Sequence, residues 1–339
     1  MTSRERIKTI ISGKAADRCG FWLGMPHHET WPIYLKHFGF TEQEDLRRFL
    51  RDDLRWIPAD DSPYKSANNR PPFDLVRLDG LDVSNPVLAD CEDAAEVEKY
   101  DWPNADYQDF SPVLETLRNA GDVYRASGTW TCFFHIIADL FGMENYFVKM
   151  YTHPEVVDAV TSHVCDFFYE ANERFFALAG DEVDGYFFGN DLGTQLDLLL
   201  SPELFDRFIR PQMQRFIDQG HRWGYQVMLH CCGAVSRLID RFIDCGIDAL
   251  HPLQAMALNM DAETLARRFK GKIAFVGGID TQDLLMNGTP ADIRADVRRV
   301  KELLGPCLVV SPSHEALLPN VPPENVLAMA EEARESAEC

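Results

Sequence analysis

The chain has 339 residues, of which 46% are hydrophobic and 26% charged, and its formal net charge is −21. This composition is typical of a globular protein with a sizeable core, and no apolar run is long enough to predict a membrane span. The negative charge argues against nucleic acids and anionic membranes as partners, because both are themselves negatively charged. The charged N-terminal segment does not read as a secretion signal, and nine scattered cysteines do not indicate a disulfide framework. We therefore expect a cytoplasmic protein.

Short apolar runs recur along the chain, and most of them end in a polar residue or a glycine. They predict eight strands, at residues 21–25, 54–59, 123–127, 185–190, 225–230, 248–253, 273–277 and 307–311. Helical periodicity between them predicts helices at 154–178, 202–219, 234–245, 262–269 and 290–304, and from Pro323 onward. Strands that alternate with helices predict a parallel sheet, and eight such units predict an α/β fold, a single (β/α)8 TIM barrel over residues 1–339. A doubly wound open sheet is the alternative, but the glycine-rich turn that it would carry after its first strand is absent.

Residues 60–120 interrupt this rhythm and are rich in proline, asparagine and aspartate. We interpret them as an insertion after the second strand, within the same domain. A short hairpin is expected around Leu78–Leu81, where an Asp-Gly pair lies between apolar residues.

Polar side chains follow most of the predicted strands, at the end of the barrel where active sites of this fold lie. They are His27, His28 and Glu29 after the first strand, Asn190, Asp191, Thr194 and Gln195 after the fourth, His230 and Cys232 at the fifth, Gln254 after the sixth, Asp280 after the seventh, and Ser311, Ser313 and His314 after the eighth. Loops are polar in general, so a single polar residue after a strand is weak evidence for a functional site. The clustering of many such residues at one end of the barrel is the stronger evidence.

His230 and Cys232 end the fifth predicted strand and form the most informative pair. Side chains alternate along a strand, so these two point the same way, with Cα atoms about 6.6 Å apart, while Cys231 faces the packing side. An imidazole and a thiolate at this spacing can bind one metal ion, and zinc suits this ligand type. The alternative is a buried histidine beside core cysteines. His314 is a candidate third ligand, or it holds a substrate carboxylate.

Asp191 follows an apolar strand and is a candidate proton donor, since burial raises the pKa of a carboxyl group. The alternative is that it caps a helix or anchors a loop. The motifs of serine hydrolases, P-loop proteins and dinucleotide-binding folds are absent, and the adjacent Cys231 and Cys232 lack the spacing of a redox motif.

At these residues the chain resembles the uroporphyrinogen decarboxylase superfamily over nearly its full length. The segments that carry the resemblance are 187–195 with 201–203, 230–233, 277–280, 311–314 and 322–325. The resemblance implies a (β/α)8 barrel. True porphyrinogen decarboxylases carry an arginine-rich motif after the first strand, and residues 21–29 contain no arginine here. That difference argues against porphyrin decarboxylation.

The other branch of the superfamily contains cobamide-dependent methyltransferases such as methylcobamide:coenzyme M methyltransferase. These bind zinc through an H-x-C pair, matched by His230 and Cys232, and through a later cysteine where this chain has His314. The resemblance therefore implies a zinc-dependent methyltransferase that moves a methyl group between a corrinoid, carried by a partner protein, and a thiol or another small acceptor. We expect substrate contacts from the rim, at His27, His28, Asn190, Gln195, Gln254 and Asp280.

Two other functions stay open. One is a metal-free decarboxylase or lyase that acts on a small carboxylic acid, with Asp191 as proton donor and His314 as carboxylate partner. The other is a non-catalytic barrel that binds a corrinoid or another ligand.

Overall fold

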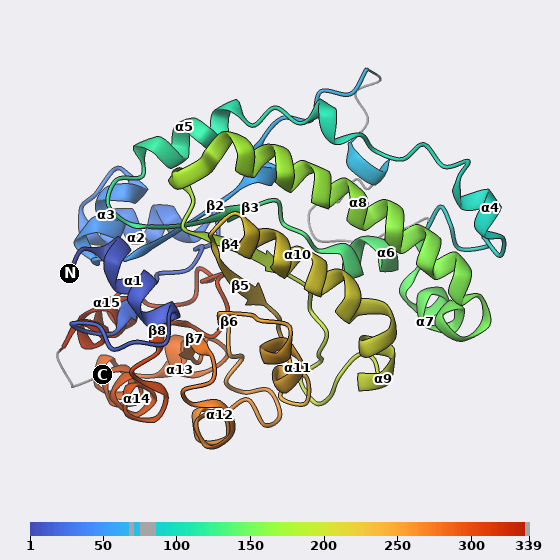
Figure 1. Ribbon diagram of the computed structural model, residues 1–339. Helices are drawn as coiled ribbons and strands as arrows, with labels where there is room; N and C mark the ends of the chain where they lie inside the picture. Colours follow the sequence, from blue (N-terminus) through green and yellow to red (C-terminus); the bar gives the residue numbers. More distant parts are fainter. Residues whose placement is uncertain (68–70, 75–85, 336–339) are drawn as a thin grey trace.

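The computed structural model describes residues 1–67, 71–74 and 86–335 of the chain. Eight parallel strands form one sheet in the order β1-β8-β7-β6-β5-β4-β3-β2. They are β1 (Gly20–Phe21), β2 (Leu54–Pro58), β3 (Tyr124–Gly128), β4 (Gly185–Gly189), β5 (Gln226–His230), β6 (Ala249–His251), β7 (Ala274–Ile279) and β8 (Leu308–Pro312). Helices surround this sheet, which confirms the predicted α/β fold, a nearly closed (β/α)8 TIM barrel (Figure 1).

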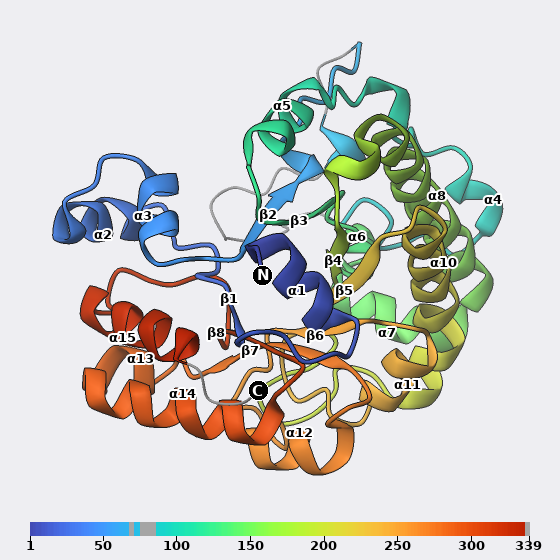
Figure 2. The same cartoon turned by 60° about the vertical axis from the view of Figure 1, so that its left-hand side comes forward.

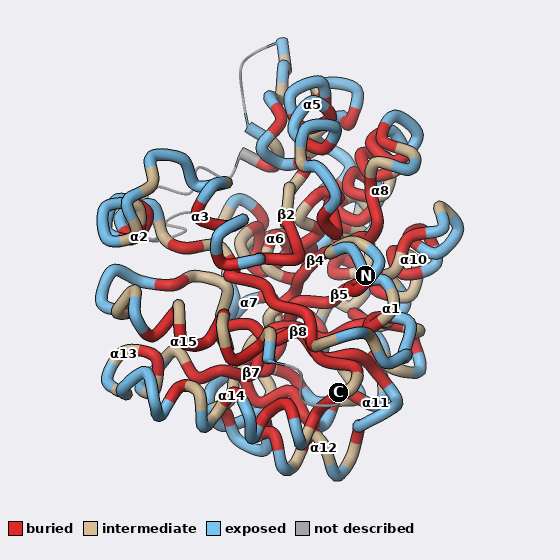
Figure 3. The backbone as a smooth tube through the Cα atoms, turned by 90° about the vertical axis from the view of Figure 1, so that its left-hand side faces the viewer, coloured by how far each residue is buried: buried red, intermediate tan, exposed pale blue. Residues whose placement is uncertain are grey.

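The helices cover the outside of the sheet, and their outer faces are exposed while the strands are buried (Figure 3). They are α1 (Ser3–Ile11), α2 (Thr30–Phe38), α3 (Gln43–Phe49), α4 (Ala94–Val97), α5 (Ser111–Asn119), α6 (Phe133–Phe141), α7 (Met143–Thr152), α8 (Pro154–Ala179), α9 (Pro202–Leu204), α10 (Arg210–Arg222), α11 (Ile239–Asp244), α12 (Ala262–Phe269), α13 (Leu284–Asn287), α14 (Pro290–Leu304) and α15 (Pro323–Arg334). A π-helical segment, Phe205–Ile209, joins α9 to α10. Within the described residues, none of these helices has both the length and the apolar character required to cross a membrane.

Local sequence explains why α14 begins and ends where predicted. The Thr289 hydroxyl accepts a hydrogen bond from the Asp292 N–H, and the Asp292 carboxylate accepts one from the Thr289 N–H. This reciprocal cap, followed by Pro290 at the first helical position, fixes the start of the helix. Apolar residues spaced three or four apart then face the barrel, and those that become buried are Ile293, Val297, Val300 and Leu304.

Several predicted elements differ in their bounds from the structure, among them the strand expected at 248–253, which spans only Ala249–His251. The strand expected at 21–25 forms ladder pairs only over Gly20–Phe21. The helix expected from Ala234 begins only at Ile239, because the Ala234 N–H donates to the Thr194 carbonyl and the chain at Gly233 lies against Gly193. A Cβ atom at Gly233 would lie 2.4 Å from the backbone of Gly193, so this glycine permits the close approach of two loops.

Residues between β2 and β3 include α4 and α5 in their described part. The hairpin expected around Leu78–Leu81 lies outside the described residues.

Helix α1 closes the N-terminal end of the barrel, and Figure 2 shows it across the strands. Ile7, Ile10 and Ile11 of this helix are buried and belong to one apolar cluster with residues inside the barrel. Gly20, at the start of β1, leaves room for Ile7, since a Cβ there would lie 2.4 Å from the Ile7 Cδ1. The interior at this end is therefore filled by apolar side chains of the described residues.

A repeated aspartate also holds this end of the barrel together. Asp53, Asp184 and Asp248 immediately precede β2, β4 and β6, and each carboxylate accepts a backbone N–H from the neighbouring strand. The donors are Phe21 at 3.0 Å, Arg125 at 3.1 Å and Val227 at 2.7 Å. The Asp53 N–H also donates to the Phe21 carbonyl at 2.8 Å, which links β1 to β2 where the ladder is incomplete. The opposite, C-terminal mouth is thus the end left for a functional site.

Candidate functional site

His230, Cys232 and Asp191 form a compact cluster at the C-terminal mouth of the barrel. His230 is the last residue of β5, and Asp191 lies just beyond β4, the strand paired with it. The Cys232 Sγ lies 3.2 Å from the His230 Nε2, and the Asp191 Oδ1 lies 3.3 Å from the same nitrogen. The Asp191 Oδ1 also accepts the Cys232 backbone N–H at 2.8 Å, so the carboxylate fixes the loop that carries the cysteine.

The donor atoms of this cluster have the spacing that a zinc ion requires. All three lie within 4.8 Å of one another. Donors around a four-coordinate zinc lie about 3.4–3.6 Å apart, given zinc–ligand distances of about 2.0–2.3 Å. The two measured separations, 3.2 and 3.3 Å, are close to this range, and a nitrogen, a sulfur and an oxygen donor suit zinc. The residues therefore fit a zinc ion, which His230, Cys232 and Asp191 would hold.

The other ring nitrogen of His230 is held by buried groups. Its Nδ1 lies 2.9 Å from the Nδ1 of His251, the last residue of β6, and 3.5 Å from the Glu315 Oε2. Burial lowers the pKa of His251 well below its usual value, and the charges of His230 and His314 add to this effect. The Nδ1 of a neutral His251 can accept a hydrogen bond from the Nδ1–H of His230, which leaves the His230 Nε2 as the nitrogen that can bind a metal.

Two pKa shifts describe the charge of the cluster. Burial disfavours the Asp191 carboxylate, but hydrogen bonding and charge from His230, together with the Cys232 N–H, hold its pKa well below its usual range. Burial likewise disfavours the His230 imidazolium, but the Glu315 carboxylate and hydrogen bonds with Asp191 and Cys232 raise the pKa of His230. Asp191 is therefore an anion at neutral pH, which suits a ligand better than a proton donor.

His314 lies on the loop after β8, at the edge of this cluster. A hydrogen bond with the Cys232 thiol raises the pKa of His314, and its ring lies perpendicular to that of His230 with 6.2 Å between centroids. Its Nδ1 accepts the Ala316 N–H at 3.1 Å and lies 3.6 Å from the Glu315 Oε2. His314 thus contacts one donor of the cluster, but among the described residues it belongs to none of the groups whose donor atoms all lie within 4.8 Å.

Comparisons with known proteins identify the family of the chain. The model of the uroporphyrinogen decarboxylase (URO-D) family matches residues 72–336, which is more than half of the chain. The chain belongs to the uroporphyrinogen decarboxylase family. The similarity stated from the sequence is thereby confirmed.

A solved structure, a methyltransferase from Methanosarcina mazei, has a similar fold, with a TM-score of 0.67 over 99% of both chains and 16% sequence identity. At that identity the likeness concerns the fold alone. No curated protein matches the chain.

Two residues predicted to contact substrate, Asn190 and Asp280, use their side-chain polar groups in hydrogen bonds with the backbone. Asn190 is fully buried, accepts the Phe134 N–H at 2.9 Å and donates to the Thr131 carbonyl at 3.0 Å. The Asp280 carboxylate accepts backbone N–H groups from three successive residues, Gln282 to Leu284. Both side chains thus anchor loops of the mouth.

Gln195 and Gln254, also predicted at the rim, form an amide chain across it. Gln254 accepts the Gly233 N–H at 2.8 Å and donates to Gln195, which in turn donates to Gln282 at 2.7 Å. This chain connects loops that follow β4, β5, β6 and β7 beside the candidate metal ligands.

The predicted pair His27 and His28 lies after β1, with 4.1 Å between ring centroids. Together with Glu29 they form a partly exposed group of possible metal donors. The His27 N–H donates to the Leu317 carbonyl at 2.9 Å, which ties this loop to the one that carries His314.

Several residues of the mouth were not predicted from the sequence, among them His251, Glu315, His135 and Asp60. His135 on α6 accepts the Asp191 N–H at 3.0 Å. Asp60, after β2, accepts the Trp130 N–H, and protein atoms crowd its carboxyl group although solvent still reaches the residue. Loss of hydration raises the pKa of Asp60 to about 6, and the Trp130 N–H opposes the shift.

Aromatic rings line the barrel below these groups. Trp130 lies 5.4 Å from His230, 5.7 Å from Phe187 and 4.8 Å from Trp56, measured between ring centroids. Trp22 is fully buried and lies 5.0 Å from His251. The histidines therefore rest on an apolar floor that excludes water from their lower faces.

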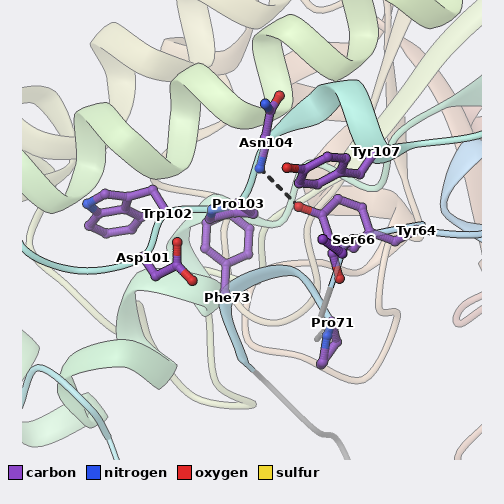
Figure 4. A pocket seen from close by; sticks show the side chains of 10 residues that line it. Tyr64, Ser66, Pro71, Phe73, Asp101, Trp102, Pro103, Asn104 and Tyr107 are labelled. Atoms are coloured by element: carbon purple, nitrogen blue, oxygen red, sulfur yellow. Dashed lines mark hydrogen bonds between the residues drawn. The ribbon is translucent and has the colours of Figure 1, made fainter. Parts of the chain in front are cut away.

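A cavity of about 330 Å³ opens beside His314. It is lined by Gln254, Thr281, Gln282, Met286, Ser313, His314, Ala316, Leu318, Asn320 and Val321. Another cavity, of about 290 Å³, is lined by none of the candidate metal ligands and lies among aromatic residues of the segment between β2 and β3 (Figure 4). There the Asn104 N–H donates to the Tyr64 hydroxyl at 2.9 Å, and neither histidine nor cysteine is among the lining residues, all of them described.

Proposed function

We propose that the protein is a zinc-dependent methyltransferase that moves a methyl group between a corrinoid, carried by a partner protein, and a thiol or another small acceptor. The observation that carries the proposal is the cluster of His230, Cys232 and Asp191 at the mouth, with donor separations that fit zinc. Family membership and the fold shared with a methyltransferase from Methanosarcina mazei support it.

Each residue of the cluster has a role in this reaction. His230 and Cys232 would hold the metal, with Asp191 or His314 as the third ligand. When bound there, zinc supplies Lewis acidity, which keeps a thiol acceptor deprotonated at neutral pH. His251 and Glu315 orient the His230 ring through its Nδ1, and Asp191 fixes the Cys232 backbone.

The group transfer is a nucleophilic displacement on the methyl carbon. The acceptor sulfur, having lost its proton to solvent, forms a bond to the methyl group as the cobalt–carbon bond of the donor breaks. The electron pair of that bond stays on the corrinoid. The amide chain of Gln195, Gln254 and Gln282 borders the cavity and positions the acceptor beside the metal ligands.

The test combines metal analysis with methyl transfer from methylcobalamin to a panel of small thiols. We expect about one zinc ion per chain and transfer that is lost on metal removal and restored by zinc. His314→Ala decides its role: reduced zinc content identifies a ligand, whereas full zinc content with abolished turnover identifies a substrate contact. A protein that neither contains zinc nor takes it up, and transfers no methyl group, would refute the proposal.

A metal-free decarboxylase is the second candidate, and one observation favours it. Asp60 has a pKa of about 6 and lies beside the aromatic floor, so it can donate a proton near neutral pH where Asp191 cannot. Release of CO₂ from small carboxylic acids by zinc-free protein, abolished in Asp60→Asn but retained in Cys232→Ala, would favour this function over methyl transfer.

A further inference from the structure

The cavity beside His314, defined above by its lining residues, adjoins the candidate metal ligands. His314 forms part of its wall, and its ring centroid lies 6.2 Å from that of His230. Gln254, which accepts the Gly233 N–H one residue after Cys232, forms another part. A molecule in this cavity would therefore present one end to the metal site.

The wall of this cavity is chemically distinctive because its polar groups are neutral. Amides and hydroxyls come from Gln254, Gln282, Asn320, Thr281 and Ser313, and apolar surface comes from Met286, Ala316, Leu318 and Val321. Neither lysine nor arginine is among its lining residues, all of which the structure describes. Several of the polar groups are already paired, for example the Ser313 Oγ, which accepts the Thr281 N–H at 3.1 Å.

Carboxylates lie close to His314, the one histidine among the lining residues. Its Nδ1 accepts a backbone N–H and lies 3.6 Å from the Glu315 carboxylate, which also lies 3.5 Å from His230. Asp191 adds a second carboxylate to the same mouth, and the whole chain carries a net charge of −21. A sulfonate, carboxylate or phosphate in this cavity would lose hydration without meeting a lysine or an arginine among the lining residues.

We infer that this cavity is the acceptor subsite and that it selects a small uncharged thiol with an apolar body over anionic thiols. The inference rests on the proposed methyltransferase function and narrows its acceptor. The volume of about 330 Å³ is at the lower end of the range for ligand pockets, which limits the acceptor to a small molecule.

The test uses a pair of acceptors matched in shape, 3-mercaptopropionamide and 3-mercaptopropionate, with 2-mercaptoethanesulfonate as a second anion. With zinc-loaded protein and methylcobalamin, we expect kcat/KM for the amide to exceed that for each anion by about tenfold. Leu318→Lys introduces a cation on a lining residue that is half exposed, and we expect it to reduce the amide preference by about fivefold. Leu196→Lys is the control, because it adds the same charge at an exposed position outside the cavity.

Because the variants are compared by the ratio between acceptors, differences in intrinsic thiol reactivity cancel. Faster transfer to either anion by the unmutated protein overturns the inference and leaves the methyltransferase function standing. Equal changes in Leu318→Lys and Leu196→Lys also overturn it.

A binding measurement tests the acceptor subsite independently of the proposed methyltransferase function. The methylated products, 3-(methylthio)propionamide and 3-(methylthio)propionate, are titrated by calorimetry without any donor. If the amide binds more tightly than the carboxylate, and this preference is smaller in Leu318→Lys, the subsite is supported even if no methyl transfer occurs. A lack of methyl transfer would then count against the proposed function alone. If neither product binds, the subsite assignment is wrong.

Discussion

The adjacent residues Cys231 and Cys232 allow a sharp test of the site, because they face opposite sides of the same strand end. Cys232 lies at the mouth with its sulfur 3.2 Å from the His230 Nε2, whereas Cys231 is 1% exposed and belongs to the apolar core. Replacing each with alanine removes the same atom from two different environments.

The expected magnitudes follow from these positions. Cys231→Ala leaves a small cavity in the core and should lower the free energy of unfolding by about 1–2 kcal/mol. Cys232→Ala removes a partly exposed sulfur and should change the stability of the metal-free protein by less than about 0.5 kcal/mol. Zinc at a hundred times its dissociation constant should stabilise the unmutated protein and Cys231→Ala by about 2.7 kcal/mol, but Cys232→Ala hardly at all.

The assay is urea unfolding of each protein with and without zinc, together with zinc content by atomic absorption. The expected pattern is opposite in the two variants: one loses stability and keeps zinc, and the other keeps stability and loses zinc. Retention of zinc by Cys232→Ala, or its loss from a folded Cys231→Ala, would refute the assignment of ligand and packing faces.

Three further predictions concern other parts of the molecule. Glu315→Gln should weaken zinc binding about ten- to hundredfold, because Glu315 helps to orient the His230 ring, whereas Glu324→Gln on the exposed start of α15 should leave affinity unchanged in the same titration. Ile10→Ala should cost about 2–5 kcal/mol in urea unfolding, since Ile10 is fully buried where α1 closes the barrel, and Ile33→Ala, at a residue 41% exposed, should cost much less. A hydrogen bond with Asp248, only partly opposed by burial, raises the pKa of His221 above 6.5, so its stabilising effect is complete below pH 6.5 and is lost as pH rises through the raised value. His221→Gln should therefore lower the melting temperature at pH 6 and have no effect at pH 9, and a deficit that stays constant with pH would contradict this linkage.

The sequence was sufficient for the strands and for the clustering of His230, Cys232 and Asp191 near the ends of two of them. Each of the eight predicted strands is present, because apolar runs bounded by glycine or polar residues are a local signal. Helix α14 was predicted with its observed bounds, since its cap and its apolar spacing are both local. The start of α11 was wrong by five residues because it depends on contact between Gly233 and Gly193, a nonlocal feature that no local pattern encodes.

The same reasoning explains the site residues that were missed. His251 lies inside a predicted strand, where a histidine is indistinguishable from a core residue until its partner His230 on the next strand is known. Glu315 follows His314 directly, and only the fold shows that its carboxylate reaches back toward β5. Asp60 opens a segment rich in aspartate and proline, so nothing local separates it from solvated neighbours, and its high pKa depends on packing at the mouth. These three residues can be assigned to the site only from their neighbours in the folded structure, because their residue types and local sequence do not distinguish them.

The closed N-terminal end of the barrel has a kinetic consequence. Because α1 fills that end with side chains, the C-terminal mouth is the entrance that the described residues leave for small and large reactants alike. A corrinoid protein docked over the mouth would block the path of a small thiol, so the thiol must bind first and its methylated product must leave last. We therefore expect a compulsory order of addition. In product-inhibition kinetics, the methylated thiol should be a competitive inhibitor with respect to the thiol and a noncompetitive inhibitor with respect to the methyl donor.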